Sequence, residues 1–152
     1  MEQVTFKDIK KSKEVNAYIY KGNSTLGVLG YTDHSAEHAV KVSSMAGKIL
    51  ECLGYGGHTV ELAKIAGYMH DIGNCVNRLD HPHSGALMAH QILRDMKMDY
   101  EDIAVIINAI GMHDEKSGGA VDTVSAALIL ADKTDVRRDR VRNQNKAAFE
   151  IG

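Results

Sequence analysis

Histidine and aspartate side chains recur where apolar stretches of this sequence end. The stretch GYMHDIGN, residues 67–74, carries His70 and Asp71 side by side at the end of an apolar run. Two ionisable side chains at the edge of a buried segment cost free energy unless other groups pair with them. Partners for His70 and Asp71 are therefore expected elsewhere in the chain, which contains 8 histidines.

Several other histidines and one further aspartate also lie near the ends of apolar stretches. His34 and His38 are four residues apart, so they would share a face if both were on one α-helix. A single histidine in such a place is more often a core or capping residue than a metal ligand, but several at once weaken that explanation. Imidazole and carboxylate groups together suit divalent ions such as zinc, iron, manganese and cobalt. The residues concerned are His34, His38, His70, Asp71, His81, His83, His113 and Asp132.

Helices are expected to position these residues, because the chain has a single proline, Pro82, and almost no β-type alternation. The segment 14–30 is less regular and is expected to be a lead-in helix with a turn at residues 21–24. Gly73 is available for a positive φ after the His-Asp doublet. Apolar spacing and capping residues predict five helices: Asp33 to Leu53 with Thr32 or Asp33 as its N-cap, about Thr59 to Met69, 85–96 after Pro82 and Ser84, 100–112 after the cap Asp99, and 123–135.

The composition is that of an ordinary globular domain. Hydrophobic residues make up 44% of the chain and charged residues 25%, and 152 residues suffice to bury a sizeable core. We therefore expect one all-α domain over residues 1–152. Because the tail has no evident cap, we expect either that the chain is a fragment with its C-terminal continuation missing or that the last helix continues to its end. Cys52 and Cys75 fit no zinc or redox spacing, and Cys52 is expected in the core.

The charge balance excludes proteins that bind nucleic acid or membranes by bulk attraction. The chain has 18 basic and 20 acidic residues, which give a formal net charge of −2. No apolar stretch approaches the roughly 20 residues that cross a bilayer, and the N-terminus lacks a signal-type segment, so a cytoplasmic protein is expected. An anionic ligand must therefore be held by local charge or by metal.

Several of these segments together resemble the HD-domain metal-dependent phosphohydrolase superfamily over about residues 33–138. HAVKVSSMAGKIL (38–50) resembles its first helix, AGYMHDIGN (66–74) its His-Asp doublet and AALILADKTDVRR (126–138) its last segment. HPHSGALMAHQIL (81–93) and INAIGMHDEKSGG (107–119) resemble segments that supply two further histidines, as in the branch of bacterial diadenosine-tetraphosphate hydrolases. The resemblance implies an HD-type helical bundle.

The resemblance also implies a metal centre, with iron, manganese, cobalt, nickel or zinc as the ion and two ions expected. His38, His70, Asp71 and Asp132 would hold one ion, and His81 and His113 a second, with Asp71 as the bridge. His34 is an addition to the family pattern, and is either a ligand, a hydrogen-bonding neighbour of the ligands or an N-terminal helix residue that faces solvent. Asp71 and His70 are the expected catalytic residues.

The implied reaction is hydrolysis of a phosphate ester or anhydride by metal-activated water, on a nucleotide or another small phosphorylated compound. Lys133 and Arg138 are the expected phosphate contacts, although the sequence RRDRVR is also typical of a solvated helix face. Asn74 stands where many members have a lysine, and the GYP element of cyclic-dinucleotide phosphodiesterases is missing. The alternative is a non-catalytic regulatory module that binds metal and nucleotide. The oligomeric state, including a homo-oligomer, stays open.

Overall fold

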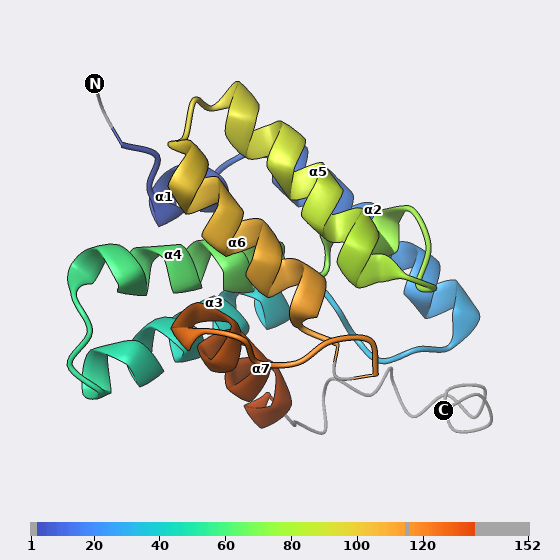
Figure 1. The fold of residues 1–152 in the computed structure, drawn as a ribbon. Coiled ribbons are helices and arrows are strands. Elements are labelled where there is room, and N and C mark those ends of the chain that lie inside the picture. Colours follow the sequence, from blue (N-terminus) through green and yellow to red (C-terminus); the bar gives the residue numbers. More distant parts are fainter. Residues whose placement is uncertain (1–2, 115, 136–152) are drawn as a thin grey trace.

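The structure, a computed structural model, describes residues 3–114 and 116–135, which form seven α-helices and one short 3-10 helix (Figure 1). No strand occurs in these residues, so the predicted all-α class is confirmed. The elements are α1 (Phe6–Lys10), α2 (Lys13–Leu29), α3 (Ala36–Cys52), α4 (Gly57–Met69), η1 (Ile72–Cys75), α5 (His81–Asp95), α6 (Tyr100–Met112) and α7 (Thr123–Thr134).

The helices pack as neighbouring pairs around one hydrophobic core. α3 lies against α4, α5 lies against α6, and α2 and α5 both contact η1 (Figure 1). α7 packs on α3, α4 and α6. The short η1 segment directly follows the His-Asp doublet, so the doublet lies where several helices meet.

The start of α3 differs from the prediction. Neither Thr32 nor Asp33 caps the helix, because Ser35 is the N-cap, in extended backbone with φ −76° and ψ 178°. His34 therefore lies in the segment before the helix and not on one helical face with His38. By contrast, α4 ends at Met69 and Asp99 caps α6 through its side chain, both as predicted.

The turn predicted at residues 21–24 is wrong, because α2 is continuous there. Its buried residues Val15, Ile19, Gly22 and Leu26 recur at helical spacing and give the helix one apolar face. The helix ends at Gly30, whose φ of 85° suits a residue without a side chain. The short helix α1 was not predicted.

Two glycines allow the close helix contacts that position the doublet. The positive φ predicted for Gly73 is wrong; the glycines with positive φ in the described residues are Gly30 and Gly54. A Cβ on Gly73 would instead overlap the backbone of His81 and Gly85, so this glycine is needed for the approach of α5. A Cβ on Gly67 would lie 2.8 Å from Cα of Ser43, so this glycine is likewise needed for the close approach of α4 to α3.

Two further observations concern single residues and hydropathy. Cys52 is exposed, so its predicted place in the core is wrong: it lies in the last turn of α3, away from the face that contacts α4. In the described residues, no helix is both long and apolar enough to span a bilayer.

Candidate metal centre

The seven predicted metal ligands come together although they belong to six different segments. Most of them lie at or next to a helix terminus, where the ends of α3, α4, α5, α6 and α7 meet. His34 precedes α3, His38 lies in its first turn, His70 and Asp71 follow α4, His81 begins α5, His113 follows α6, and Asp132 lies in the last turn of α7. His83 points elsewhere: it is exposed and pairs with Asp80 at 2.6 Å.

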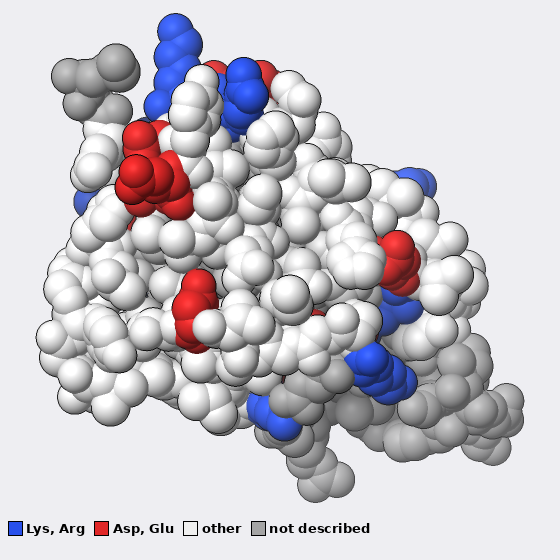
Figure 2. Space-filling view, in the orientation of Figure 1, with Lys and Arg blue, Asp and Glu red and all other residues white. Residues whose placement is uncertain are grey.

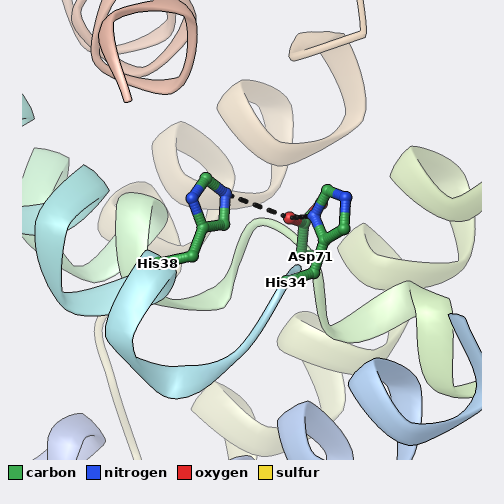
Figure 3. Close-up of side chains that lie close together, drawn as sticks. All are labelled: His34, His38 and Asp71. Atoms are coloured by element: carbon green, nitrogen blue, oxygen red, sulfur yellow. Dashed lines mark hydrogen bonds and ion pairs between the residues drawn. The ribbon is translucent and has the colours of Figure 1, made fainter. Parts of the chain in front are cut away.

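The Asp71 carboxylate is the centre of this cluster, and its two oxygens face different histidines. Oδ2 lies 2.6 Å from Nδ1 of His34, 3.4 Å from Nε2 of His38 and 3.1 Å from Nε2 of His70. Oδ1 lies 3.4 Å from Nε2 of His81 and 3.7 Å from Nε2 of His113. Figure 3 shows the His34 and His38 rings on either side of the Asp71 carboxylate, one from the segment before α3 and one from its first turn.

Asp132 closes the cluster from the side of α7. Its Oδ1 lies 3.2 Å from Nε2 of His38 and 3.5 Å from Nε2 of His70. Two carboxylates therefore face the same pair of imidazole nitrogens.

In His70, His81 and His113 the hydrogen bond made by Nδ1 determines which ring nitrogen carries the hydrogen. Nδ1 of His70 donates to the carbonyl of Gly67 at 2.7 Å, Nδ1 of His113 to the carbonyl of Ile110 at 2.7 Å, and Nδ1 of His81 to the carbonyl of Arg78 at 3.0 Å. A carbonyl only accepts, so in each neutral ring Nδ1 carries the hydrogen and Nε2 carries a lone pair. These lone pairs are directed at Asp71 and at one another.

His38 is oriented by a residue that the sequence did not single out. Its Nδ1 lies 2.7 Å from Oδ2 of Asp135, which is buried at the end of α7. Such carboxylate–histidine pairs orient metal-ligating rings in many proteins and raise their basicity. Asp135 follows Asp132 by one helical turn, and this spacing is the signal that points to it.

The donor atoms fit a divalent cation. Nε2 of His38 and Nε2 of His70 are buried without a hydrogen-bond partner, and the Nε2 atoms of His81 and His113 lie 3.2 Å apart. Buried polar atoms are normally satisfied, so lone pairs that face each other call for a positive charge between them. Within residues 3–114 and 116–135, three groups have atoms close enough to hold an ion: His34, His38 and Asp71; His38, His70 and Asp132; and His70, Asp71 and His113.

Electrostatics in the metal-free cluster favour charged pairs. Burial alone would lower the pKa of His70, but the Asp71 and Asp132 carboxylates outweigh it and hold that pKa well above its usual value. Burial would raise the pKa of Asp71 and of Asp132, but His70, with His34 or His38, outweighs it and lowers both. Burial, by contrast, lowers the pKa of His34 despite its contact with Asp71. The acids are therefore ionised and able to bind a cation.

A pocket of about 350 Å³ opens onto the cluster. Besides the ligand candidates, the cationic residues that line it in the described part of the chain are Arg78, Lys116 and the predicted phosphate contact Lys133. Arg138, the other predicted phosphate contact, lies outside the described residues. Sequence reasoning missed Arg78, because it follows the doublet by several residues in an irregular segment.

With this geometry in view, the chain can be compared with known proteins. The family profile of the HD domain matches residues 35–142, which is most of the chain. The protein belongs to the HD domain family. A solved structure that it resembles is a predicted HD superfamily hydrolase from an uncultured Thermotogales bacterium, with a TM-score of 0.61 and 22% identity over 81% of this chain and 67% of that one. At this identity the likeness shows the fold.

Curated relatives are longer proteins. An uncharacterized protein of Methanocaldococcus jannaschii is 29% identical over 92% of this chain and 62% of its own length. Ribonuclease Y of Enterococcus faecalis is 30% identical over 76% of this chain, but this region makes up 20% of that protein. Ribonuclease Y of Opitutus terrae is likewise 30% identical, over 21% of its length. The chain thus spans less than two thirds of these relatives.

Proposed function

We propose that this HD-domain protein is a metal-dependent phosphohydrolase that cleaves a phosphate ester or anhydride. The observation that carries the proposal is the division of the Asp71 carboxylate between two sets of histidines, His34, His38 and His70 on Oδ2 and His81 and His113 on Oδ1. A carboxylate with this environment suits a bridge between two divalent ions. Iron, manganese, cobalt, nickel or zinc are the candidates by ligand type.

In this proposal some residues hold the metal ions, and others keep the histidine rings in the orientation that binding needs. His38, His70 and Asp132 would hold one ion, His81 and His113 would hold the other, and Asp71 would contribute to both sites. His34 would add a contact to the first. Bound divalent ions supply a water of lowered pKa and offset the negative charge on phosphoryl oxygens. Asp135 keeps the His38 ring in place, and the carbonyls of Gly67 and Ile110 do the same for His70 and His113.

The substrate class that we propose is a small phosphorylated compound, with a nucleotide or dinucleoside polyphosphate as the first choice. Lys133 lines the pocket and supplies a positive charge beside the carboxylates. The small pocket, of about 350 Å³, suits a phosphate-rich end of a molecule better than a long polymer.

RNA is the second candidate substrate, favoured by the similarity to proteins named ribonuclease Y. Two observations weigh against it. The residues that line the pocket in the described part of the chain include no Phe, Tyr or Trp ring on which a base could stack. The chain has a net charge of −2, and on the face that Figure 2 shows the Lys and Arg side chains form no continuous band.

The experiment is a hydrolysis screen of the metal-loaded full chain. Nucleotides, diadenosine polyphosphates, p-nitrophenyl phosphates and a short RNA are incubated with added manganese, iron or cobalt, and released phosphate or nucleotide is measured. Turnover of a small phosphate compound that is lost in Asp71→Ala supports the proposal. Binding of a nucleotide without turnover of any compound would favour the alternative, a regulatory module. Asn74 is the residue that favours this alternative, because many members of the family have a lysine at its position.

A further inference from the structure

Arg78 is a half-buried cation in the wall of the pocket above the histidine cluster. Arg78 lines the pocket together with His34, His81 and Asp71, and its side chain is half-buried. Its backbone carbonyl accepts the hydrogen bond from Nδ1 of His81, so main chain and side chain of one residue serve the same site. The positive charge is close enough to His34 to add to the effect of burial in lowering the pKa of that ring.

Two neighbours hold the guanidinium in a fixed place. Nη1 donates to Oδ1 of Asn74 at 3.2 Å, and Cζ lies 5.9 Å from the centre of the Tyr31 ring. Asn74 is itself only 1% exposed, and in the described residues its Nδ2 has no hydrogen-bond partner, so its amide meets the guanidinium through Oδ1. An arginine that is stacked and hydrogen-bonded in this way loses less conformational freedom when it binds a ligand.

Most donors of the guanidinium are still available. Arginine has five N–H donors, and the one hydrogen bond that Arg78 makes from this group within residues 3–114 and 116–135 uses one of them. No carboxylate of the same residues forms an ion pair with it. A planar fork of this kind, next to a pocket, matches two oxygens of one phosphoryl group.

We propose that the guanidinium of Arg78, held by Asn74 and Tyr31, binds phosphoryl oxygens of the ligand in this pocket. Asn74 then has a definite role at the position where many HD-domain proteins have a lysine: it positions a cation that comes from Arg78 instead. The proposal rests on the proposed function in that it uses the same pocket. It also names the ligand group, a phosphoryl group with at least two unesterified oxygens.

The chain offers a matched control in Arg94. Its Cζ lies 5.6 Å from the centre of the Tyr100 ring, so it is also an arginine over a tyrosine, but it does not line this pocket. Removing either arginine deletes one positive charge and one contact with a tyrosine ring, although Arg94 is exposed and Arg78 is half-buried and bonded to Asn74. A difference between the two variants therefore reports on the pocket and not on the loss of a cation.

The test measures binding of inorganic phosphate to the metal-loaded full chain by calorimetry. We expect Arg78→Ala to weaken binding by about 10- to 100-fold, the size of a lost charged hydrogen-bond pair, with metal content unchanged. Arg78→Lys should restore part of the affinity, because lysine keeps the charge without the fork. Arg94→Ala should bind as the wild type does. For any compound that the screen finds to be hydrolysed, Asn74→Ala should raise KM more than it lowers kcat.

Three results would overturn the inference: no phosphate binding by the wild type, equal binding by Arg78→Ala and Arg94→Ala, or loss of metal in Arg78→Ala. The proposed function fails separately, when the metal-loaded wild type hydrolyses no compound of the screen. Phosphate binding that depends on Arg78 but is accompanied by no hydrolysis would leave the inference standing and the enzyme proposal refuted.

Discussion

The two ends of α4 each carry a histidine next to an aspartate, but the two ends differ in kind. His58, in the first turn, pairs with Asp102 at 2.8 Å, and its side chain is 53% exposed. His70, which follows the last turn, lies 3.1 Å from Asp71, and its side chain is 1% exposed. Cavity size does not identify the metal centre, because the cavity beside His58 measures about 590 Å³ and the one above Asp71 only about 350 Å³.

The two ends of α4 differ in how many histidines surround the carboxylate. Asp102 lines its cavity with one histidine, whereas Asp71 faces five histidines from four other segments and its own doublet. At the His70 end, the Nε2 atoms of His38 and His70 are buried without a hydrogen-bond partner, and each has a lone pair to offer when its ring is neutral. A histidine–carboxylate pair alone is therefore a weak sign of a metal centre, and several buried lone pairs around one carboxylate are a strong one.

The largest expected effect is the loss of metal-induced stabilisation when the histidine after α4, His70, is removed, with removal of His58 at the other end as the control. In wild type, a divalent ion at a thousandfold excess over its Kd should stabilise the protein by about 4 kcal/mol, seen as a rise in Tm. His70→Ala should lose this rise, and His58→Ala should keep it. Equal metal-induced shifts in both variants would remove the distinction drawn above.

Asp135→Asn should have the next largest effect. The amide cannot supply the negative charge that holds the Nδ1 hydrogen of His38, so metal affinity should fall by about 10- to 100-fold. Asp102→Asn makes the same change in the exposed pair and should leave metal affinity unaltered. Titration with a competing chelator measures both, and an unchanged affinity in Asp135→Asn would show that His38 needs no such support.

The metal-free protein should lose stability as the pH rises. His70 and His38 have folded pKa values raised above the usual 6.5, so their contribution is present below pH 6.5 and lost as pH rises through the folded values. Asp71 and Asp132 have pKa values lowered below 3.8, so their contribution is present above pH 3.8 and lost as pH falls further. Urea unfolding of chelator-treated protein should show a loss on the order of 1 kcal/mol or more above pH 6.5.

With metal bound, the trend at neutral pH should reverse. Metal ligation requires neutral imidazole, so protons compete with the ion and metal-induced stabilisation grows as the pH rises. A metal-free protein whose stability does not change between pH 6 and pH 9 would contradict the charged pairs described for the cluster.

The smallest effect is expected at the exposed end of α4. His58→Ala should change the free energy of unfolding by at most about 1 kcal/mol, because solvent screens an exposed pair. Urea unfolding at neutral pH measures this. A loss of several kcal/mol would mean that the His58–Asp102 pair is a structural centre in its own right.

Much of the cluster was predictable because its residues lie at helix ends, where an apolar pattern stops visibly. His70, Asp71 and His113 follow the last residues of α4 and α6, and both ends were predicted from apolar spacing and glycine. Asp99 as the N-cap and the regular spacing of apolar residues allowed α6 to be predicted from the order of its residues alone. The all-α class followed from the same periodicity.

The remainder depended on choices that spacing does not decide. Thr32, Asp33 and Ser35 are all good N-caps, but the helix begins after Ser35, and His34 lies outside it in contact with Asn23 and Asp71. The α2 helix passes through Gly22 and Asn23 because its buried face packs on η1 and outweighs their poor propensity. Asp135 and Arg78 act through long-range contacts with His38 and the pocket, which a local pattern does not reveal.

Element-specific metal analysis of purified wild type and Asp71→Ala tests the central claim most directly. Five histidines around two oxygens of one carboxylate should bind two divalent ions per chain in the wild type and lose both when the shared carboxylate is removed. One ion in the wild type, bound without His81 and His113, would refute the two-ion arrangement. Metal content that is equal in wild type and Asp71→Ala would contradict the account altogether.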